Sequence, residues 1–165
     1  MSNLPATSLL HLDQQLCFPI YAASNAITRA YRPLLEPLGL TYPQYLVMMV
    51  LWEQAPQMVS EIGRKLHLDS GTLTPLLKRL QTQGFVLRQR DTADERRVLV
   101  TLTEAGQALK AQAESVPRSM ACHLLNSAVD LPQLRQELRQ LLQTLTQGDT
   151  PSTEPTSTSP KERAA

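Results

Sequence analysis

Two cysteines are the residues of this chain with the most distinctive chemistry. Cys17 stands in the segment DQQLCFPIY, and Tyr21, Tyr31 and Tyr42 follow it within 25 residues. Phenolic hydroxyls can donate hydrogen bonds to a thiolate, which favours the ionised and reactive form of a thiol. A lone cysteine is most often a small buried hydrophobic residue. The tyrosines that follow Cys17 nevertheless favour a reactive sulfur.

The other neighbours of Cys17 leave open what would stabilise its thiolate. Asp13, one helical turn earlier, has the wrong sign, and Arg29 and Arg32 could approach only through folding or from a second subunit. Pro19 leaves two local structures open. Either a first helix is kinked beside Cys17, or a helix begins at Pro19 and leaves the cysteine just outside its N-terminus, where the helix dipole favours a thiolate.

The segment from residue 59 to residue 102 predicts a helix-turn-helix followed by a wing. Apolar residues recur three or four apart in two stretches separated only by residues 67–69: Val59, Ile62 and Leu66, then Leu73, Leu76, Leu77 and Leu80. This spacing predicts two short helices joined by a tight turn. If the second helix starts at Gly71 or Thr72, Pro75 falls in its first turn, and Gly84 is a plausible C-cap.

A charged hairpin is expected directly after the second helix. Residues 85–90 and 97–102 are rich in strand formers and are joined by the sequence DTADER. The tip of this hairpin carries Asp94 and Arg96. Two helices followed by such a hairpin are typical of a winged helix-turn-helix that binds DNA.

Polar and basic residues of this segment are of the types that bind DNA. Small hydroxyls approach base edges and phosphates closely, and the free amides at a helix start attract phosphate. Residues 59–102 contain eight Lys and Arg against five Asp and Glu, a local excess of three positive charges in a chain of formal net charge +1. A solvated charged face is the alternative explanation. The candidate DNA-binding residues are Ser70, Thr72, Thr74, Lys78, Arg79, Arg88, Arg90, Asp94 and Arg96.

Apolar stripes at both ends of the chain predict helices that pair between subunits. They comprise Leu9, Leu12, Leu16, Ile20, Ala23, Ile27, Ala30 and Leu34 at one end, and Leu131, Leu134, Leu138, Leu141, Leu142 and Leu145 at the other. Two such stripes exceed what one small winged domain covers, and DNA-binding proteins of this type usually pair about a two-fold axis. We therefore expect a homodimer. The alternative is that the two helices cover each other within one subunit.

The expected fold class is mainly α with a small β-hairpin wing. Further helices are expected over 42–54, where Met48 and Met49 would fill gaps in the core, and from Glu104 to about residue 126. The winged helix-turn-helix domain would span 1–147, with its DNA-binding part at about 43–102 and a dimerisation layer of N- and C-terminal helices at about 9–36 and 104–147. Residues 148–165 hold three prolines, seven Ser and Thr and no large apolar side chain, so we expect a disordered tail.

Length and composition limit the possible classes. The chain has 165 residues of which 42% are hydrophobic, enough for a single core. No apolar run approaches the ~18 residues of a membrane span, and the N-terminus lacks the pattern of a signal peptide, so we expect a cytoplasmic protein with no membrane partner. His11, His67 and His123 lie far apart in sequence, and only Cys122 adds a second ligand type nearby. We therefore expect no metal site and no cofactor.

Four segments together resemble the organic-hydroperoxide-resistance regulators, the OhrR branch of the MarR family of bacterial repressors. They are LDQQLCFPIY, RPLLEPLGLTYPQYLVMMVLWE, LDSGTLTPLLKRLQTQGFV and DERRVLVTLTEAG, and the resemblance runs from about Leu12 to Leu145. It implies a homodimeric repressor that binds a palindromic operator when reduced and is released when an organic hydroperoxide oxidises a cysteine near its N-terminus. Asp94 and Arg96 match the wing pair that enters the minor groove.

The resemblance also implies roles for the cysteines and tyrosines. Cys17 matches the redox-sensing cysteine, and Tyr31 and Tyr42 match tyrosines that hydrogen-bond this cysteine from the other subunit. Cys122 matches the second cysteine of the two-cysteine subgroup, which converts the sulfenic acid into an intersubunit disulfide.

Two other functions would use only part of these residues. A MarR-type repressor that is released by non-covalent binding of a phenolic or lipophilic ligand would keep the DNA contacts but need neither cysteine. A thiol peroxidase would need Cys17 and a resolving thiol but would have no use for Arg96. A redox-switched repressor needs both sets, so we expect this function and no enzyme activity.

Overall fold

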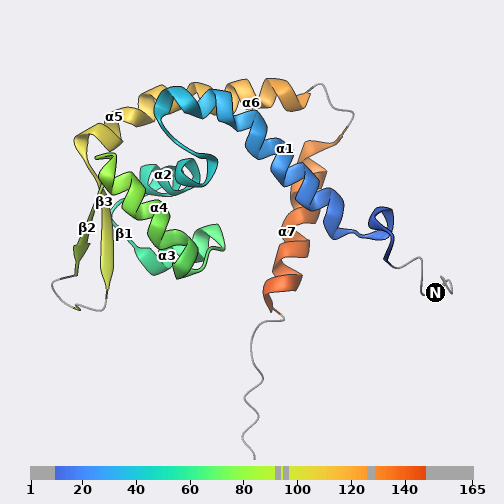
Figure 1. The fold of residues 1–165 in the computed structure, drawn as a ribbon, viewed down its shortest axis with the longest axis horizontal. Helices are drawn as coiled ribbons and strands as arrows, with labels where there is room; N and C mark the ends of the chain where they lie inside the picture. The colour runs from blue at the N-terminus through green and yellow to red at the C-terminus, as the bar shows by residue number, and fades with distance from the viewer. Residues whose placement is uncertain (1–9, 92–93, 95–96, 126–128, 148–165) are drawn as a thin grey trace, which may run out of the picture. The chain divides into compact units, whose positions relative to one another are not determined.

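The computed structural model of the chain describes residues 10–91, 94, 97–125 and 129–147. The chain divides into two units, Met1–Leu124 and Leu125–Ala165, which we describe separately. The elements in chain order are η2 (Leu12–Gln14), α1 (Cys17–Leu35), η3 (Glu36–Leu38), α2 (Tyr42–Glu53), β1 (Gln57–Met58), α3 (Val59–Leu66), α4 (Ser70–Thr82), β2 (Val86–Arg90), β3 (Val98–Leu102), α5 (Glu104–Ala113), α6 (Ser115–Leu125) and α7 (Leu131–Gln147) (Figure 1).

The predicted helix-turn-helix is confirmed as α3 and α4. Glu61 caps the start of α3 by accepting a hydrogen bond from the Met58 amide at 3.1 Å. His67 adopts a left-handed conformation with φ 51°, which ends α3. Asp69 then caps α4 by accepting from the Thr72 amide at 2.8 Å. Side chains at the two caps therefore set the short turn between the helices.

The start of α4 differs from the expectation for Pro75. The helix begins at Ser70, so Pro75 lies beyond the first turn and cannot donate to the Gly71 carbonyl. The Asp69 cap stabilises this earlier start, so α4 forms although the Gly71 carbonyl lacks its usual backbone donor at position 75. At the other end Gly84 has φ 78°, and the Phe85 amide donates to the Leu80 carbonyl at 3.0 Å. Gly84 thus ends the helix as expected, as the left-handed residue directly after the C-cap residue Gln83, because glycine adopts this conformation at little cost.

The predicted hairpin is confirmed as β2 and β3, and a third strand joins it. The antiparallel sheet has the order β1-β3-β2, with Val86 opposite Leu102 and Gln57 opposite Val100. The sequence analysis missed β1, because a strand of two residues is too short to show an alternating pattern. The extra strand ties the segment before α3 to the wing.

The core of the first unit lies beneath the recognition helix α4. Its largest fully buried side chains are Leu35, Val47, Met48, Leu51, Ile62, Leu73, Leu77, Leu80, Val86 and Val100. Met48 is completely buried, as expected, whereas Met49 is 38% exposed, so the prediction that both methionines fill the core was wrong for Met49. The three leucines of α4 fix the helix on the core and leave its polar face outward.

The first long helix starts later than the apolar stripe suggested. Residues 12–14 form a separate 3₁₀ turn, and α1 begins at Cys17. Pro19 is the third residue of α1, where an amide has no partner within the helix, and the Phe18 amide donates to the Gln15 carbonyl at 3.2 Å instead. Pro19 therefore neither kinks a longer helix nor begins one, because Cys17 itself occupies the first helical position.

A single long helix after Glu104 was also expected, and the structure divides this segment. α5 ends at Ala113 and α6 begins at Ser115. Pro117 is the third residue of α6 and cannot donate to the Ala113 carbonyl, which explains the break between the two helices.

The helix α7 of the second unit is amphipathic and well exposed. Four of its leucines lie on one stripe and are exposed by 38% to 63%: Leu134, Leu138, Leu142 and Leu145. The Asp130 side chain accepts from the Gln133 amide at 3.0 Å and caps its start. Among the described residues, no helix is long and apolar enough to cross a bilayer.

Candidate DNA interface and redox site

The N-terminal end of α4 presents the small polar residues Ser70, Thr72 and Thr74. Two of their hydroxyls already donate a hydrogen bond within the helix start. The Thr72 hydroxyl donates to the Asp69 carboxylate at 2.9 Å, and the Thr74 hydroxyl donates to the Ser70 carbonyl at 2.7 Å. These two hydroxyl oxygens remain able to accept from a base amino group. Hydrogen bonds from the backbone and then the side chain of Thr72 hold the pKa of Asp69 below its ordinary value, so the cap stays ionised at neutral pH.

Basic residues continue this face along α4 and onto the wing. Lys78 and Arg79 are exposed on α4, and Arg90 is exposed at the end of β2. Arg88 is half-buried, and its Nε donates to the Gln81 side chain at 2.7 Å, which holds the guanidinium beside α4. The structure thus places these four predicted cations on the recognition helix and the adjoining strand.

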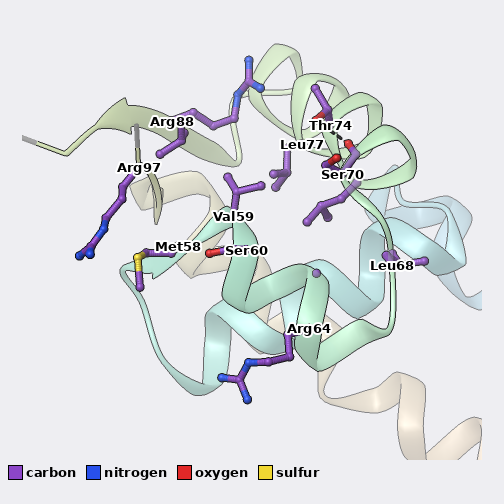
Figure 2. A pocket seen from close by; sticks show the side chains of 13 residues that line it. Met58, Val59, Ser60, Arg64, Leu68, Ser70, Thr74, Leu77, Arg88 and Arg97 are labelled. Atoms are coloured by element: carbon purple, nitrogen blue, oxygen red, sulfur yellow. Dashed lines mark hydrogen bonds between the residues drawn. The ribbon is translucent and has the colours of Figure 1, made fainter. Parts of the chain in front are cut away.

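A hollow of about 460 Å³ lies between α3, α4 and the wing. Figure 2 shows Arg64, Arg88 and Arg97 around it, from α3, from β2 and from the residue before β3. The apolar residues that line it are Met58, Val59, Leu68, Leu73, Leu77 and Val98, together with Ser60, Gly63, Ser70 and Thr74. The hollow therefore combines an apolar floor with three cations, and we call it the basic hollow.

The basic hollow shows which residues sequence reasoning missed. Arg64 and Arg97 contributed to the local charge but were not among the predicted DNA-binding residues. Arg64 lies in the last turn of α3 and Arg97 precedes β3, so only the folded arrangement of helix and wing places both in the lining of the hollow that Arg88 also lines. The local excess of positive charge was the only signal in the sequence that pointed to them.

The described part of the wing tip contains an ion pair. Arg97 Nε lies 3.2 Å from Asp94 Oδ2, with both side chains substantially exposed. The Arg97 amide also donates to the Asp94 carbonyl at 2.9 Å, which closes the tip. The predicted partner of Asp94 in DNA binding, Arg96, lies outside the described residues.

Three tyrosines gather where α1 meets α2. The Tyr31 and Tyr42 ring centroids are 4.6 Å apart, and Tyr45 lies 6.1 Å from Tyr31. Burial raises the pKa of all three phenols, with smaller contributions from neighbouring phenols at Tyr31 and Tyr45. At neutral pH each phenol is therefore protonated and keeps a hydroxyl that can donate a hydrogen bond.

The hollow beside these tyrosines also contains cations. Arg29 and Arg32 line it together with Glu36, Thr41 and Tyr42, in a volume of about 560 Å³. Folding therefore brings Arg29 and Arg32 to the hollow that Tyr42 lines, one of the tyrosines that the sequence analysis singled out. A thiolate that entered this hollow would meet a phenol donor and two guanidinium groups, which together outnumber the single carboxylate of Glu36 in the same lining.

Cys17 and Tyr31 of one chain lie too far apart along α1 to bond each other. Both belong to the same continuous helix, 14 residues apart, which corresponds to about 21 Å at 1.5 Å per residue. The Cys17 side chain is exposed at the helix start, and Cys122 is exposed on α6. The structure of one chain thus brings Tyr31 and Tyr42 together but holds Cys17 far from Tyr31.

The tyrosine cluster gives an expected response to alkaline pH. A phenol whose pKa is raised on folding stabilises the fold below the unfolded-state pKa of about 10, and this stabilisation is lost as pH rises through the folded-state value. We expect the doubly substituted Tyr31→Phe/Tyr42→Phe variant to lose less thermal stability than wild type between pH 9 and pH 11. Thermal melts at several pH values measure this, and parallel losses in both proteins would contradict it.

Within the described residues, no three His, Cys, Asp or Glu side chains form a group suited to a metal ion. The site is thus built from a cationic surface on α4 and the wing, an aromatic and cationic hollow at α1 and α2, and two exposed thiols.

Comparison with known proteins identifies the family. Residues 29–113 match the family model described as transcriptional regulator SarA/Rot. The organic hydroperoxide resistance transcriptional regulator of Bacillus subtilis is 47% identical over 138 residues, which cover 84% of this chain and 94% of that protein. This chain belongs to the OhrR branch of the MarR family of transcriptional regulators.

Solved structures of a second relative, AbfR, agree in fold. AbfR of Staphylococcus epidermidis, reduced and bound to DNA, is 37% identical with a TM-score of 0.69, covering 87% of this chain and 98% of that one. AbfR in a disulfide-formed state is 40% identical with a TM-score of 0.60, covering 85% and 96%. The fold is therefore a winged helix-turn-helix, as predicted, and regulators of this MarR family are dimers.

Proposed function

We propose that the reduced homodimer represses transcription by binding a palindromic operator, and that an organic hydroperoxide releases it by oxidising Cys17. The observation that carries this proposal is the combination in one unit of a cationic recognition surface with an exposed thiol and a distant tyrosine cluster. The name of the Bacillus subtilis relative and the DNA-bound and disulfide-formed structures of AbfR support it.

In the DNA complex, α4 would enter the major groove. Ser70, Thr72 and Thr74 would lie at base edges, because small side chains in the first turn allow close approach. The phosphate contacts would come from Lys78, Arg79, Arg88 and Arg90. Asp94 and Arg96 at the wing tip would reach the minor groove.

The redox step would use Cys17 of one subunit and, in the other subunit, the hollow that Tyr42 lines together with Arg29 and Arg32. The thiolate attacks the outer oxygen of the hydroperoxide, so that Cys17 becomes a sulfenic acid and the peroxide leaves as an alcohol. Because Tyr31 and Tyr42 cannot reach the cysteine of their own chain, they would donate hydrogen bonds to the partner's thiolate. The thiol of Cys122 from the other subunit would then displace water from the sulfenic acid and form the disulfide.

Apolar side chains beside the sulfur favour an organic oxidant. Leu16, Phe18 and Ile20 flank Cys17, with exposed fractions of 69%, 38% and 38%. They can shelter an alkyl tail, and each methylene removed from water contributes about 0.8 kcal/mol.

Such a protein reports an oxidant rather than turning it over, so we propose no enzyme activity. Since its operator is chromosomal DNA, we place it in the bacterial cytoplasm.

Operator titration tests this function. The duplex would be one that the reduced protein selects from a random-sequence pool, and affinity would be measured with and without cumene hydroperoxide, followed by dithiothreitol. We expect the peroxide to release the DNA and dithiothreitol to restore binding. Unchanged affinity after full thiol oxidation would refute the redox switch.

The basic hollow favours a second candidate function, release by a non-covalent ligand. Its apolar floor and three arginines suit a phenolic or lipophilic anion, and its volume lies within the usual range of ligand sites. In this case a variant with both cysteines replaced by serine would still leave DNA when the ligand is added. Release by peroxide that depends on Cys17 decides for the redox function.

The cationic surface gives a further prediction. Arg88→Ala should weaken operator binding about eight-fold at 0.1 M salt and reduce the slope of log affinity against log salt by about one unit, because one phosphate contact fewer releases fewer counterions. Arg118→Ala removes an exposed arginine of α6 and should leave both quantities unchanged. An unaltered slope in Arg88→Ala would remove this residue from the interface.

A further inference from the structure

A series of hydrogen bonds made by the Gln44 and Gln83 side chains joins the segment around Tyr42 to the end of the recognition helix α4. Gln44 of α2 is 4% exposed, and its Oε1 accepts from the Thr41 amide at 2.8 Å and from the Thr41 hydroxyl at 2.9 Å. Its Nε2 donates to Gln83 Oε1 at 3.1 Å, and Gln83 Nε2 donates to the Gly39 carbonyl at 2.7 Å. The two amides thus connect residues 39–44 with α4.

The two ends of this hydrogen-bonded series belong to different parts of the proposed switch. Tyr42 is the first residue of α2, between Thr41 and Gln44, and its ring packs on Tyr31. Gln83 is the C-cap residue of α4, directly after the recognition helix. Any movement of Tyr42 therefore moves the backbone that holds Gln44.

The burial of Gln44 makes the connection stiff. A buried amide that loses its partners is strongly disfavoured, because no water replaces them. If the segment that carries Tyr42 shifts, Gln44 either takes Gln83 with it or leaves its own amide group unpaired. Within the described residues, the bond from Gln44 to Gln83 is the side-chain hydrogen bond that the structure records between α2 and the C-cap of α4.

We propose that Gln44 and Gln83 are positioning residues that transmit a displacement of the Tyr42 segment to α4. They would thereby set how strongly oxidation of the partner's Cys17 weakens operator binding. The inference rests on the proposed function, because it requires that Tyr42 meets the partner's Cys17. Oxidation converts the thiolate into a group that no longer accepts the same hydrogen bond, the Tyr42 segment relaxes, and the amide pair carries this displacement to the end of α4.

Gln83→Met tests the connection. Methionine is similar in length but neither donates to Gly39 nor accepts from Gln44, and the exposed position tolerates it. We expect the reduced variant to bind the selected operator within about two-fold of wild type, while the ratio of oxidised to reduced Kd falls by about three- to ten-fold. Gln83→Glu, which still accepts from Gln44, should recover part of the ratio. Gln107→Met makes the same change at an exposed position of α5 and should behave as wild type.

The outcomes separate the inference from the function beneath it. A wild-type ratio in Gln83→Met, with release by peroxide intact, overturns the coupling and leaves the proposed function standing. An equal loss of affinity in the reduced and oxidised forms shows a merely structural role and also overturns it. If peroxide does not release wild type, the proposed function fails and the coupling fails with it.

Discussion

The Cys17→Ser variant should stay bound to operator DNA at peroxide concentrations that release wild type completely. A serine hydroxyl is not ionised at neutral pH and is not oxidised by hydroperoxides, so the first step of the switch cannot occur. Because Cys17 is exposed at the first position of α1, the change removes no buried contact within the chain, and a serine hydroxyl can still accept from the partner's tyrosines, so reduced binding should be preserved. Fluorescence anisotropy of the labelled operator during a peroxide titration measures this.

Cys122→Ser provides the matched control for this experiment. It also removes one exposed thiol, yet it leaves Cys17 able to form a sulfenic acid. We expect release by peroxide to persist, while recovery in dithiothreitol after excess oxidant is poor, because an unprotected sulfenic acid proceeds to the irreversible sulfinic acid. Non-reducing gels should show a covalent dimer of oxidised wild type that either substitution abolishes. Release of Cys17→Ser at the wild-type peroxide concentration would exclude the cysteine switch.

Local sequence signals predicted the DNA-binding half of the fold well. The apolar spacing that placed α3 and α4, the glycine at position 84 that ends α4 and the strand-rich segments of the hairpin are features of neighbouring residues. For this reason the polar face of α4 could be identified before the fold. The short strand β1 and the helix break before Pro117 depend on tertiary pairing and on one proline, and they were missed or misplaced.

The redox half depended more on the fold. The sequence marked Cys17 and the tyrosines by type, but only the structure shows that Tyr31 and Tyr42 pack together while α1 holds Tyr31 about 21 Å from its own cysteine. The Gln44 and Gln83 pair spans 39 residues of sequence and carried no signal. Long-range contacts between ordinary polar residues have no periodicity, so a single sequence does not reveal them.

Gly106→Ala should destabilise the first unit by about 3 kcal/mol and lower its Tm by about 10 °C. Gly106 is buried in the first turn of α5 against the start of the wing. A Cβ at this position would overlap the Phe85 carbonyl oxygen and lie 2.9 Å from its carbonyl carbon. Since these are backbone atoms, no side-chain rotation relieves the overlap, and α5 must move away.

That movement would break several hydrogen bonds at once. The Thr103 amide donates to the Phe85 carbonyl at 3.1 Å, and Trp52 Nε1 donates to the Gly106 carbonyl at 2.9 Å. Both bonds anchor α5, the helix that follows the wing in the chain. We therefore expect operator affinity to fall together with stability, and calorimetry and operator titration at 15 °C and 30 °C would show the two losses in parallel.

Gly71→Ala adds the same methyl group to another helix and serves as the control. There the new Cβ would lie 3.0 Å from Asp69 Oδ1, so the capping carboxylate need shift by only a few tenths of an ångström while it keeps the Thr72 amide, and alanine favours the helix by up to about 1 kcal/mol over glycine. Its Tm should stay within a few degrees of wild type. If Gly106→Ala melts at the temperature of Gly71→Ala, the close approach of α5 to Phe85 does not constrain the position of the wing.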